Sequence, residues 1–203
     1  MRRRKDNTKN LIIERARRQF LANGYTATTV DVIAAEAGIT KRTLYGYFEN
    51  KRTLFLEVIR SAVGNPPDEL FFRREIKTRQ DIVDMLHSVA AGLNDITTRP
   101  HYIQLLRIAI AEIPFQPDVS VLFEQSMAHQ SLDWLSAFFA EIDRQGFATI
   151  AHPEVLARSF AGSFVIRMVL DGLLRAPSDM EIKPLAEEDI EALVDTFVRG
   201  IGP

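Results

Sequence analysis

The sequence predicts an all-α protein in which a small N-terminal three-helix domain of the helix-turn-helix type is followed by a larger helical domain. Apolar residues recur at helical spacing along nearly the whole chain, and no stretch shows the alternation typical of strands. The breaks fall where Gly and Pro cluster. The charges divide in the same way: residues 1–60 carry 13 basic and 6 acidic groups, and the rest carries 12 and 21. Only the first part therefore suits a polyanion.

The first predicted helix covers residues 8 to 22, and Gly24 follows as its stop. Its apolar face is formed by residues about one helical turn apart: Ile12 or Ile13, Ala16 and Phe20. The preceding residues 1–7 form a basic tail with the run Arg2-Arg3-Arg4-Lys5. Two interpretations stay open for this tail: an arm that enters a DNA minor groove, or a disordered segment loosely attracted to the polyanion.

The next two predicted helices are joined by a tight turn at Gly38. The first has apolar residues at i, i+3, i+4 and i+7, namely Val30, Ile33, Ala34 and Ala37. Thr40 can cap the second, whose buried side is set by Leu44 and Phe48. Its opposite side shows Lys41, Arg42, Thr43 and Tyr47. A helix-turn-helix needs this division, because its second helix anchors by one face and offers donors to phosphates and base edges with the other.

The run TTVDVIAAEAGITKRTLYGYFENKRTLF, residues 28–55, resembles the N-terminal signature of the TetR family of bacterial transcriptional regulators. The resemblance covers about residues 9–58. It implies that Thr28 and Thr29 meet phosphate at the start of the second helix, and that Lys51 grips phosphate. It also implies positions in or beside the major groove for Lys41, Arg42, Thr43, Tyr45 and Tyr47.

Two positions depart from the usual family pattern. Arg42 stands where the family often has a small residue, and its guanidinium can pair bidentately with guanine or hold another phosphate. Gly46, between two tyrosines, presents no side chain, which lets the backbone approach DNA closely but costs about 1 kcal/mol of helix stability relative to Ala. Arg42 therefore leaves the operator sequence open, while Gly46 offers no side chain with which to read a base.

The helix that starts near Lys51 is predicted to join the two domains, which we place at residues 1–50 and 51–203. It ends near Gly64, and residues 65–78 form the predicted linker. Three helices are expected next: one through Ile82 and Leu93 that ends before Pro100, one at 101–113, and one at 118–145. The segment 101–113 is apolar nearly all round, which favours burial on several sides. With its Pro-Phe exit it also resembles the C-terminal domain of one TetR subgroup.

The last two helices, near 153–175 and 186–200, are predicted to make a dimer interface. Their candidate contact residues are Phe160, Val169, Leu173, Leu193 and Phe197. The alternative is that these apolar stripes close the core of a single chain, and the sequence alone allows both. The resemblance favours the homodimer, whose recognition helices, about 34 Å apart, would read a pseudo-palindromic operator in double-stranded DNA.

The resemblance further implies that the C-terminal helices form a ligand-binding and dimerisation domain with a pocket for a small apolar or amphipathic ligand. The candidate lining residues are His87, Leu106, Phe123, Met127, Trp134, Phe138 and Met168. The same residue types are the usual filling of helical bundles, so a plain core is the competing interpretation.

Several kinds of site are not expected. The chain has no Cys, which excludes disulfides and thiolate metal sites, and none of its four histidines forms an i, i+4 pair with another. It also lacks the motifs of nucleotide-binding and hydrolytic enzymes. We therefore expect no catalytic residue, no metal and no cofactor. The lack of a signal peptide and of an apolar stretch of about 18 residues predicts a cytoplasmic protein with no membrane partner.

The functional prediction is a DNA-binding regulator, a repressor that a small ligand releases from its operator. The ligand would shift the spacing of the two recognition helices through the helix that starts at Lys51. A tenfold loss of operator affinity requires only about 1.4 kcal/mol of differential binding. The alternative is a DNA-bound protein-interaction factor of the same fold, with no small-molecule inducer.

Overall fold

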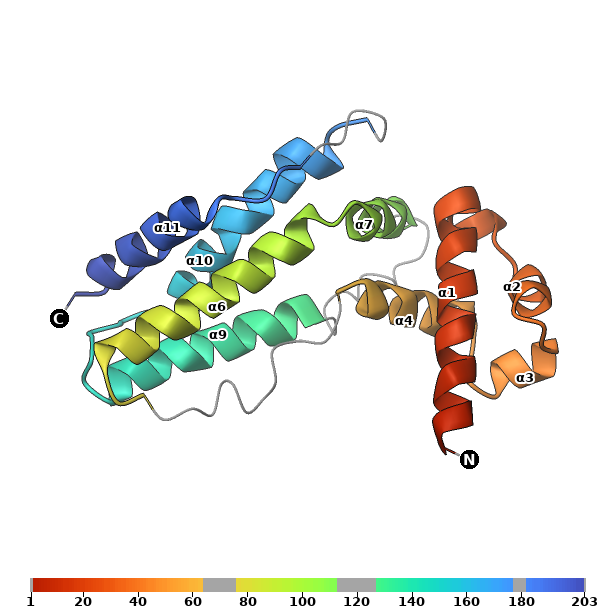
Figure 1. Ribbon diagram of the computed structural model, residues 1–203, viewed down its shortest axis with the longest axis horizontal. Helices are drawn as coiled ribbons and strands as arrows, with labels where there is room; N and C mark the ends of the chain where they lie inside the picture. Colours follow the sequence, from red (N-terminus) through yellow and green to blue (C-terminus); the bar gives the residue numbers. More distant parts are fainter. Residues whose placement is uncertain (1, 64–75, 113–126, 177–181, 203) are drawn as a thin grey trace. The chain divides into compact units, whose positions relative to one another are not determined.

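The computed structural model describes residues 2–63, 76–112, 127–176 and 182–202, of which residues 2–5, 63 and 127–131 are described by their backbone alone. Every regular element in these ranges is a helix (Figure 1). The predicted all-α fold is confirmed. The chain forms two compact units: residues 1–64 with 104–124, the N-terminal unit, and residues 65–103 with 125–203, the C-terminal unit.

In the N-terminal unit, α1 (Arg2–Ala27) packs against α2 (Val30–Glu36) and α4 (Lys51–Val63), and α2 packs against α3 (Lys41–Tyr45). The apolar positions expected from helical spacing are all buried: Ile12, Ile13, Ala16, Phe20, Val30, Ile33, Ala34, Ala37, Leu44 and Phe48. Aromatic rings add to this core, with the Phe20 and Phe55 centroids 4.8 Å apart and those of Tyr25 and Phe55 5.0 Å apart. The helix-turn-helix is thus held through the packing of α2 on α1, which also packs against α4.

The ends of α1 differ from the expectation. The helix already begins at Arg2, so the basic segment is a helical extension of α1, and its interpretation as a disordered tail is wrong. Gly24 breaks the helical backbone with φ of 75°, as expected of a stop, and Gly38 makes the α2–α3 turn with φ of 65°. Both values lie in the left-handed region that residues with a Cβ atom rarely adopt.

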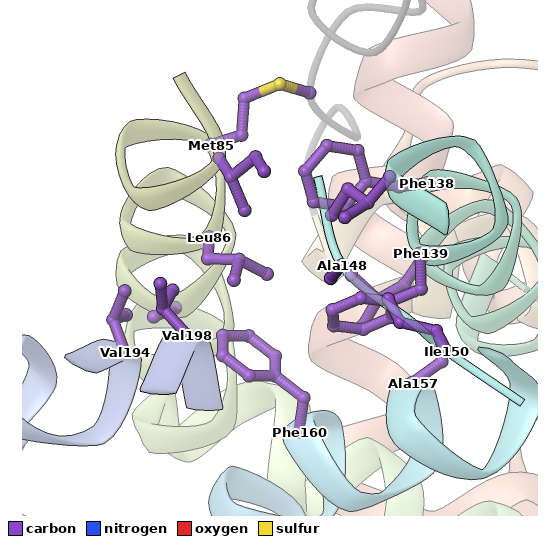
Figure 2. Close-up of a cluster of buried hydrophobic side chains, with 14 of the residues drawn as sticks. Met85, Leu86, Phe138, Phe139, Ala148, Ile150, Ala157, Phe160, Val194 and Val198 are labelled. Atoms are coloured by element: carbon purple, nitrogen blue, oxygen red, sulfur yellow. The ribbon is translucent and has the colours of Figure 1, made fainter. Parts of the chain in front are cut away.

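In the C-terminal unit, α10 (Pro153–Arg167) packs against α9 (Met127–Arg144) and α6 (Arg79–Thr98), and α6 packs against α11 (Glu187–Gly200). Figure 2 shows their shared apolar core, in which Phe160 of α10, Leu86 of α6 and Phe139 of α9 point into the same cluster. Such a core supplies the main stabilising free energy of the unit, because it removes large apolar surfaces from water.

Two polar contacts fix α6 and α11 in antiparallel register. At one end, Arg79 Nη2 donates to the Val198 carbonyl at 2.8 Å and Nη1 donates to the Gly202 carbonyl at 3.3 Å. At the other end, the buried Asn94 amide donates to the Leu185 carbonyl at 3.1 Å and accepts from the Leu185 N–H at 2.8 Å. Each contact satisfies backbone groups that the end of α11, or the segment before it, leaves unpaired.

A π-helical turn, η1 (Met168–Leu173), continues α10. A Cβ atom built at Gly172 would lie 2.5 Å from Cδ1 of Ile182 and 3.2 Å from Cδ1 of Ile103, so any larger residue would force the ends of these side chains to move. Ile103 belongs to α7 (Pro100–Glu112), which starts in the C-terminal unit and ends in the N-terminal unit. In the described ranges, no helix combines the length and apolar character needed to cross a lipid bilayer.

Candidate nucleic-acid interface

Burial of one side of α3 determines which side of this helix faces outward. Thr40 caps the helix, its Oγ1 accepting from the Thr43 N–H at 3.1 Å, and the fully buried Leu44 anchors it. The helix is five residues long, shorter than the apolar spacing suggested, because the backbone turns after Tyr45. Phe48 is buried just beyond it, so the segment is held at both ends.

The polar side chains predicted for the outer side do lie there. Lys41, Arg42, Thr43 and Tyr45 are exposed, and Tyr47 is half-buried. Within the described ranges, the Arg42 side chain makes no hydrogen bond or ion pair, and only its backbone carbonyl is bonded, to the Gly46 N–H. Its guanidinium is therefore free to bind an external acceptor. A donor-rich surface above a fixed backbone is what recognition of base edges and phosphates requires.

Lys41 has a partner inside the unit. Its Nζ atom lies 2.8 Å from Oδ2 of Asp31 on α2, and both side chains are exposed. The hydrogen bond to Asp31, together with the charge of that carboxylate, raises the pKa of Lys41, so the lysine stays cationic. The pair draws the Lys41 ammonium toward the first turn of α2.

The first turn of α2 adds backbone donors to the same unit. Thr29 is the N-cap, and its Oγ1 accepts from the Val32 N–H at 3.3 Å. The first N–H groups of a helix have no intrahelical carbonyl partner and carry a partial positive charge, which favours an anion. Thr29 is exposed at this end.

Thr28 is placed differently from its neighbour. Its side chain is only 2% exposed, and the hydroxyl lies 2.7 Å from the Gly24 carbonyl and 3.1 Å from the Gln19 carbonyl of α1. A hydroxyl has one hydrogen to donate, and here it is donated inward. The Thr28 side chain therefore closes the end of α1, and the expected phosphate contact of this side chain is not available.

The Lys51 side chain also points into the protein, which differs from the phosphate contact that we expected. Its Nζ atom donates to the carbonyls of Tyr25 at 2.9 Å, Thr28 at 3.0 Å and Thr26 at 3.4 Å. Three carbonyls occupy the three hydrogens of an ammonium group. Burial lowers the pKa of Lys51, while the charge of Glu112 opposes that shift. The residue joins the start of α4 to the end of α1.

Sequence reasoning missed the partners of this lysine. The Thr26 hydroxyl lies 3.0 and 3.1 Å from the two carboxylate oxygens of Glu112, at the end of α7. Tyr25 packs its ring beneath Lys51, and burial raises the pKa of its phenol. Thr26 and Glu112 are 86 residues apart in sequence, so no local pattern could have paired them.

The candidate ligand-binding residues fall in separate environments. Trp134 stacks on Phe138 with centroids 6.0 Å apart at the edge of the apolar core, and Met168 is buried. His87 pairs instead with Glu187 of α11, and the buried Leu106 belongs to the N-terminal unit. Phe123 and the side chain of Met127 lie outside the described residues. A shared ligand site for these residues stays a prediction.

The candidate dimer residues need one correction. Phe160 is fully buried within its own chain, with its ring 5.0 Å from that of Phe197, so it cannot meet a partner chain. Leu193 and Phe197 are partly buried against the same core, and Val169 and Leu173 are half-buried. Large apolar side chains are exposed at other positions of α10 and η1 and just after η1: Val155, Val165, Ile166, Leu170 and Leu174.

Comparison with known proteins agrees with this architecture. Residues 12–58 match the profile of bacterial regulatory proteins of the tetR family, and residues 84–200, more than half of the chain, match that of the AefR-like transcriptional repressor C-terminal domain. The uncharacterised regulators YhgD and YerO of Bacillus subtilis are 46% identical over 50 residues and 24% identical over 192 residues. These matches cover 25% and 94% of this chain, and 26% and 66% of the two relatives.

A solved structure is similar over nearly the whole length. It is described as the flavonoid-responsive regulator FrrA, with a TM-score of 0.70 and 25% sequence identity. The alignment covers 97% of this chain and 95% of that one.

Proposed function

Because the chain belongs to the TetR family of bacterial regulatory proteins, which are DNA-binding transcriptional regulators, we propose that it is a repressor that binds its operator as a dimer. The observation that carries the DNA contact is the outer side of α3. There the free guanidinium of Arg42 lies beside Lys41, Thr43 and Tyr45, opposite the buried Leu44. These residues, with Thr29 at the start of α2 and Tyr47, make up the proposed interface.

The charge distribution supports this orientation on DNA. Residues 1–60 carry a net charge of +7, and the remainder carries −9. The acidic part is repelled by the polyanion, so the N-terminal helices should lead the approach. Operator affinity should then fall steeply with salt, because each phosphate contact releases condensed counterions.

For the dimer, we propose contact through the exposed apolar residues of α10, η1 and the residue that follows. Ile166, Leu170 and Leu174 follow one another at four-residue spacing, and their exposures in the single chain are 53%, 55% and 72%. Apolar side chains of this size in a row are typical of a surface that another chain covers. A twofold contact here would present two recognition helices to a pseudo-palindrome.

For control of the repressor, we propose a small ligand in the C-terminal unit. The match to an AefR-like repressor C-terminal domain and the likeness to a flavonoid-responsive regulator support a ligand of the small apolar or amphipathic kind. A path to the DNA-binding helices is the far end of α7, where Glu112 accepts from Thr26 beside Lys51. A ligand that moved this end of α7 would disturb the α1–α2 turn, and thereby the placement of α2 and α3.

Selection of bound fragments from random duplexes tests the proposal. We expect an enriched pseudo-palindrome, and Lys41→Ala and Arg42→Ala should each weaken its binding. A lost phosphate contact flattens the log–log salt slope by about 0.9, whereas a lost base contact relaxes preference at one position. Arg158→Ala, an exposed change on α10, is the control and should leave binding unchanged. Failure of every duplex to bind at low ionic strength would overturn the proposal.

A further inference from the structure

An imidazole and two carboxylates meet on the surface of the C-terminal unit, outside the proposed interface. His87 of α6 and Glu187 and Glu191 of α11 each place one ligand atom within 4.8 Å of the other two. Nε2 of His87 lies 3.0 Å from Oε1 of Glu187. We propose that these three residues bind a divalent transition-metal ion of the Zn²⁺ type, which links α6 to α11.

The juxtaposition follows from the register of the two helices. Arg79 binds the end of α11 through Val198 and Gly202, and Asn94 binds the backbone of Leu185 just before α11 starts. His87 lies between Arg79 and Asn94 along α6, and its Nε2 atom reaches Glu187 in the first turn of α11. The backbones that carry the three donors are therefore held at both ends, as a preorganised site requires.

The spacing on α11 suits a shared ligand. Glu187 and Glu191 are four residues apart, which places both carboxylates on one face of the helix, toward His87. Ligands of a tetrahedral zinc site at about 2.0–2.1 Å from the metal lie about 3.4 Å from one another. The separations here, from 3.0 Å up to 4.8 Å, bracket that value, so small side-chain rotations close the site.

The charges also favour a cation. Two carboxylates at this spacing repel each other, and no Lys or Arg of the described ranges forms an ion pair with Glu187 or Glu191. The His87 imidazole lies against only one of the two carboxylates, that of Glu187, so it can relieve only part of this excess. A divalent ion placed among the three would neutralise both carboxylates.

The donor set indicates which ion. Zinc binds both imidazole nitrogen and carboxylate oxygen, and three protein ligands can leave a fourth position for water. Calcium and magnesium prefer sites made of oxygen alone. Sequence spacing does not reveal this site, because His87 precedes Glu187 and Glu191 by 100 residues or more.

Zinc titration of the chelator-treated full chain, followed by calorimetry, tests the assignment. We expect one Zn²⁺ per chain with an affinity in the micromolar range, and at least tenfold weaker binding in Glu191→Gln and in His87→Gln. Glu188→Gln is the matched control: it removes the same charge from the next position of α11, outside the trio, and should bind as the unchanged protein does. Mg²⁺ at the same concentration should not compete.

A second measurement distinguishes the loss of zinc binding from the misfolding of a variant. Zn²⁺ should raise the melting temperature of the unchanged protein and of Glu188→Gln, since an ion that binds only the folded state stabilises it, but not that of Glu191→Gln. Glu191→Gln leaves the His87–Glu187 contact in place, so its melting temperature without metal should stay normal. Absence of zinc binding below millimolar concentration, or equal weakening by Glu188→Gln, would overturn the proposal.

Discussion

The Nζ atom of Lys51 lies 4.3 Å from the centre of the Tyr25 ring and 2.9 Å from the carbonyl oxygen of the same residue. The lysine is therefore held both by a carbonyl dipole and by the face of an aromatic ring, and it also binds the Thr28 carbonyl at 3.0 Å. It satisfies carbonyls that the end of α1 leaves open, a role that stabilises the fold of the helix-turn-helix.

Lys51→Met should lower the stability of the protein without altering the salt dependence of DNA binding. The substitution leaves carbonyls with only water as a partner, which costs about 1 kcal/mol or more of unfolding free energy. Chemical denaturation measures this loss, and fluorescence anisotropy at several salt concentrations measures the slope. Lys41→Met is the control: it should flatten the salt slope of DNA binding and leave the stability of the protein nearly unchanged. A flatter slope for Lys51→Met would restore its role as a phosphate contact.

Thr26→Val should weaken operator binding by a few fold, although Thr26 is not part of the proposed interface. The change keeps the shape of the side chain but removes the hydroxyl that donates to Glu112. The end of α7 then loses this hydrogen bond to the α1–α2 turn. Thr196→Val, which removes an exposed hydroxyl bonded within α11, is the control. An operator affinity equal to that of the unchanged protein would rule out this connection.

The buried residues of the helix-turn-helix could be predicted because they depend on local spacing. Ile12, Phe20, Ile33 and Leu44 occupy positions that helical periodicity assigns to one face, and all four are fully buried. The inward direction of Lys51 could not be predicted in this way. It depends on carbonyls 23 to 26 residues upstream, whose position is set by how α1 packs on α4.

The apolar stripe of α10 shows a second limit of sequence reasoning. Helical spacing alone grouped Phe160 with later apolar residues as a contact surface. Phe160 instead fills the core, and the π turn at Met168–Leu173 changes the register of the residues that follow. Nothing in the local sequence signals a π turn, because it depends on the close approach that Gly172 allows toward Ile103 and Ile182.

Phe160→Ala should destabilise a single chain, by about 3–5 kcal/mol, because it leaves a cavity among α6, α9 and α10. The loss should be the same at low and high protein concentration, as measured by denaturant unfolding below and above the dimer dissociation constant. Phe160→Leu, a milder change, serves if the alanine variant does not fold. A variant that unfolds normally but dissociates into single chains would place Phe160 back in the interface.

Leu170→Glu should convert the proposed dimer into single chains. The residue is 55% exposed in η1, and a charge there would be buried without a partner in a twofold contact. Analytical ultracentrifugation should show a dissociation constant raised by at least about 100-fold, the equivalent of about 2.7 kcal/mol. The matched control is Ile110→Glu in α7, where the side chain is 49% exposed. Equal effects of the two changes would remove the interface from α10.

Asp81→Asn should reduce the loss of stability that acid causes. Asp81 Oδ2 accepts from the Lys77 N–H at 2.9 Å and from the Thr78 N–H at 2.7 Å, at the start of α6. The Lys77 N–H, followed by the hydroxyl and N–H of Thr78, lowers the pKa of Asp81. The carboxylate thus stabilises the fold above its unfolded pKa of about 3.9, and this contribution disappears as the pH falls through the lower pKa of the folded state.

Unfolding midpoints of the two proteins should therefore differ most near neutral pH and converge as the pH falls below about 4. Asp84→Asn is the control, because it removes the same charge one turn later. There, in the part of the chain that the structure describes, the carboxylate accepts only from the Gln80 side chain. If Asp84→Asn gave the same difference with the same pH dependence, the effect would belong to the net charge of α6. A difference confined to Asp81→Asn would assign it to the backbone N–H groups that this carboxylate caps.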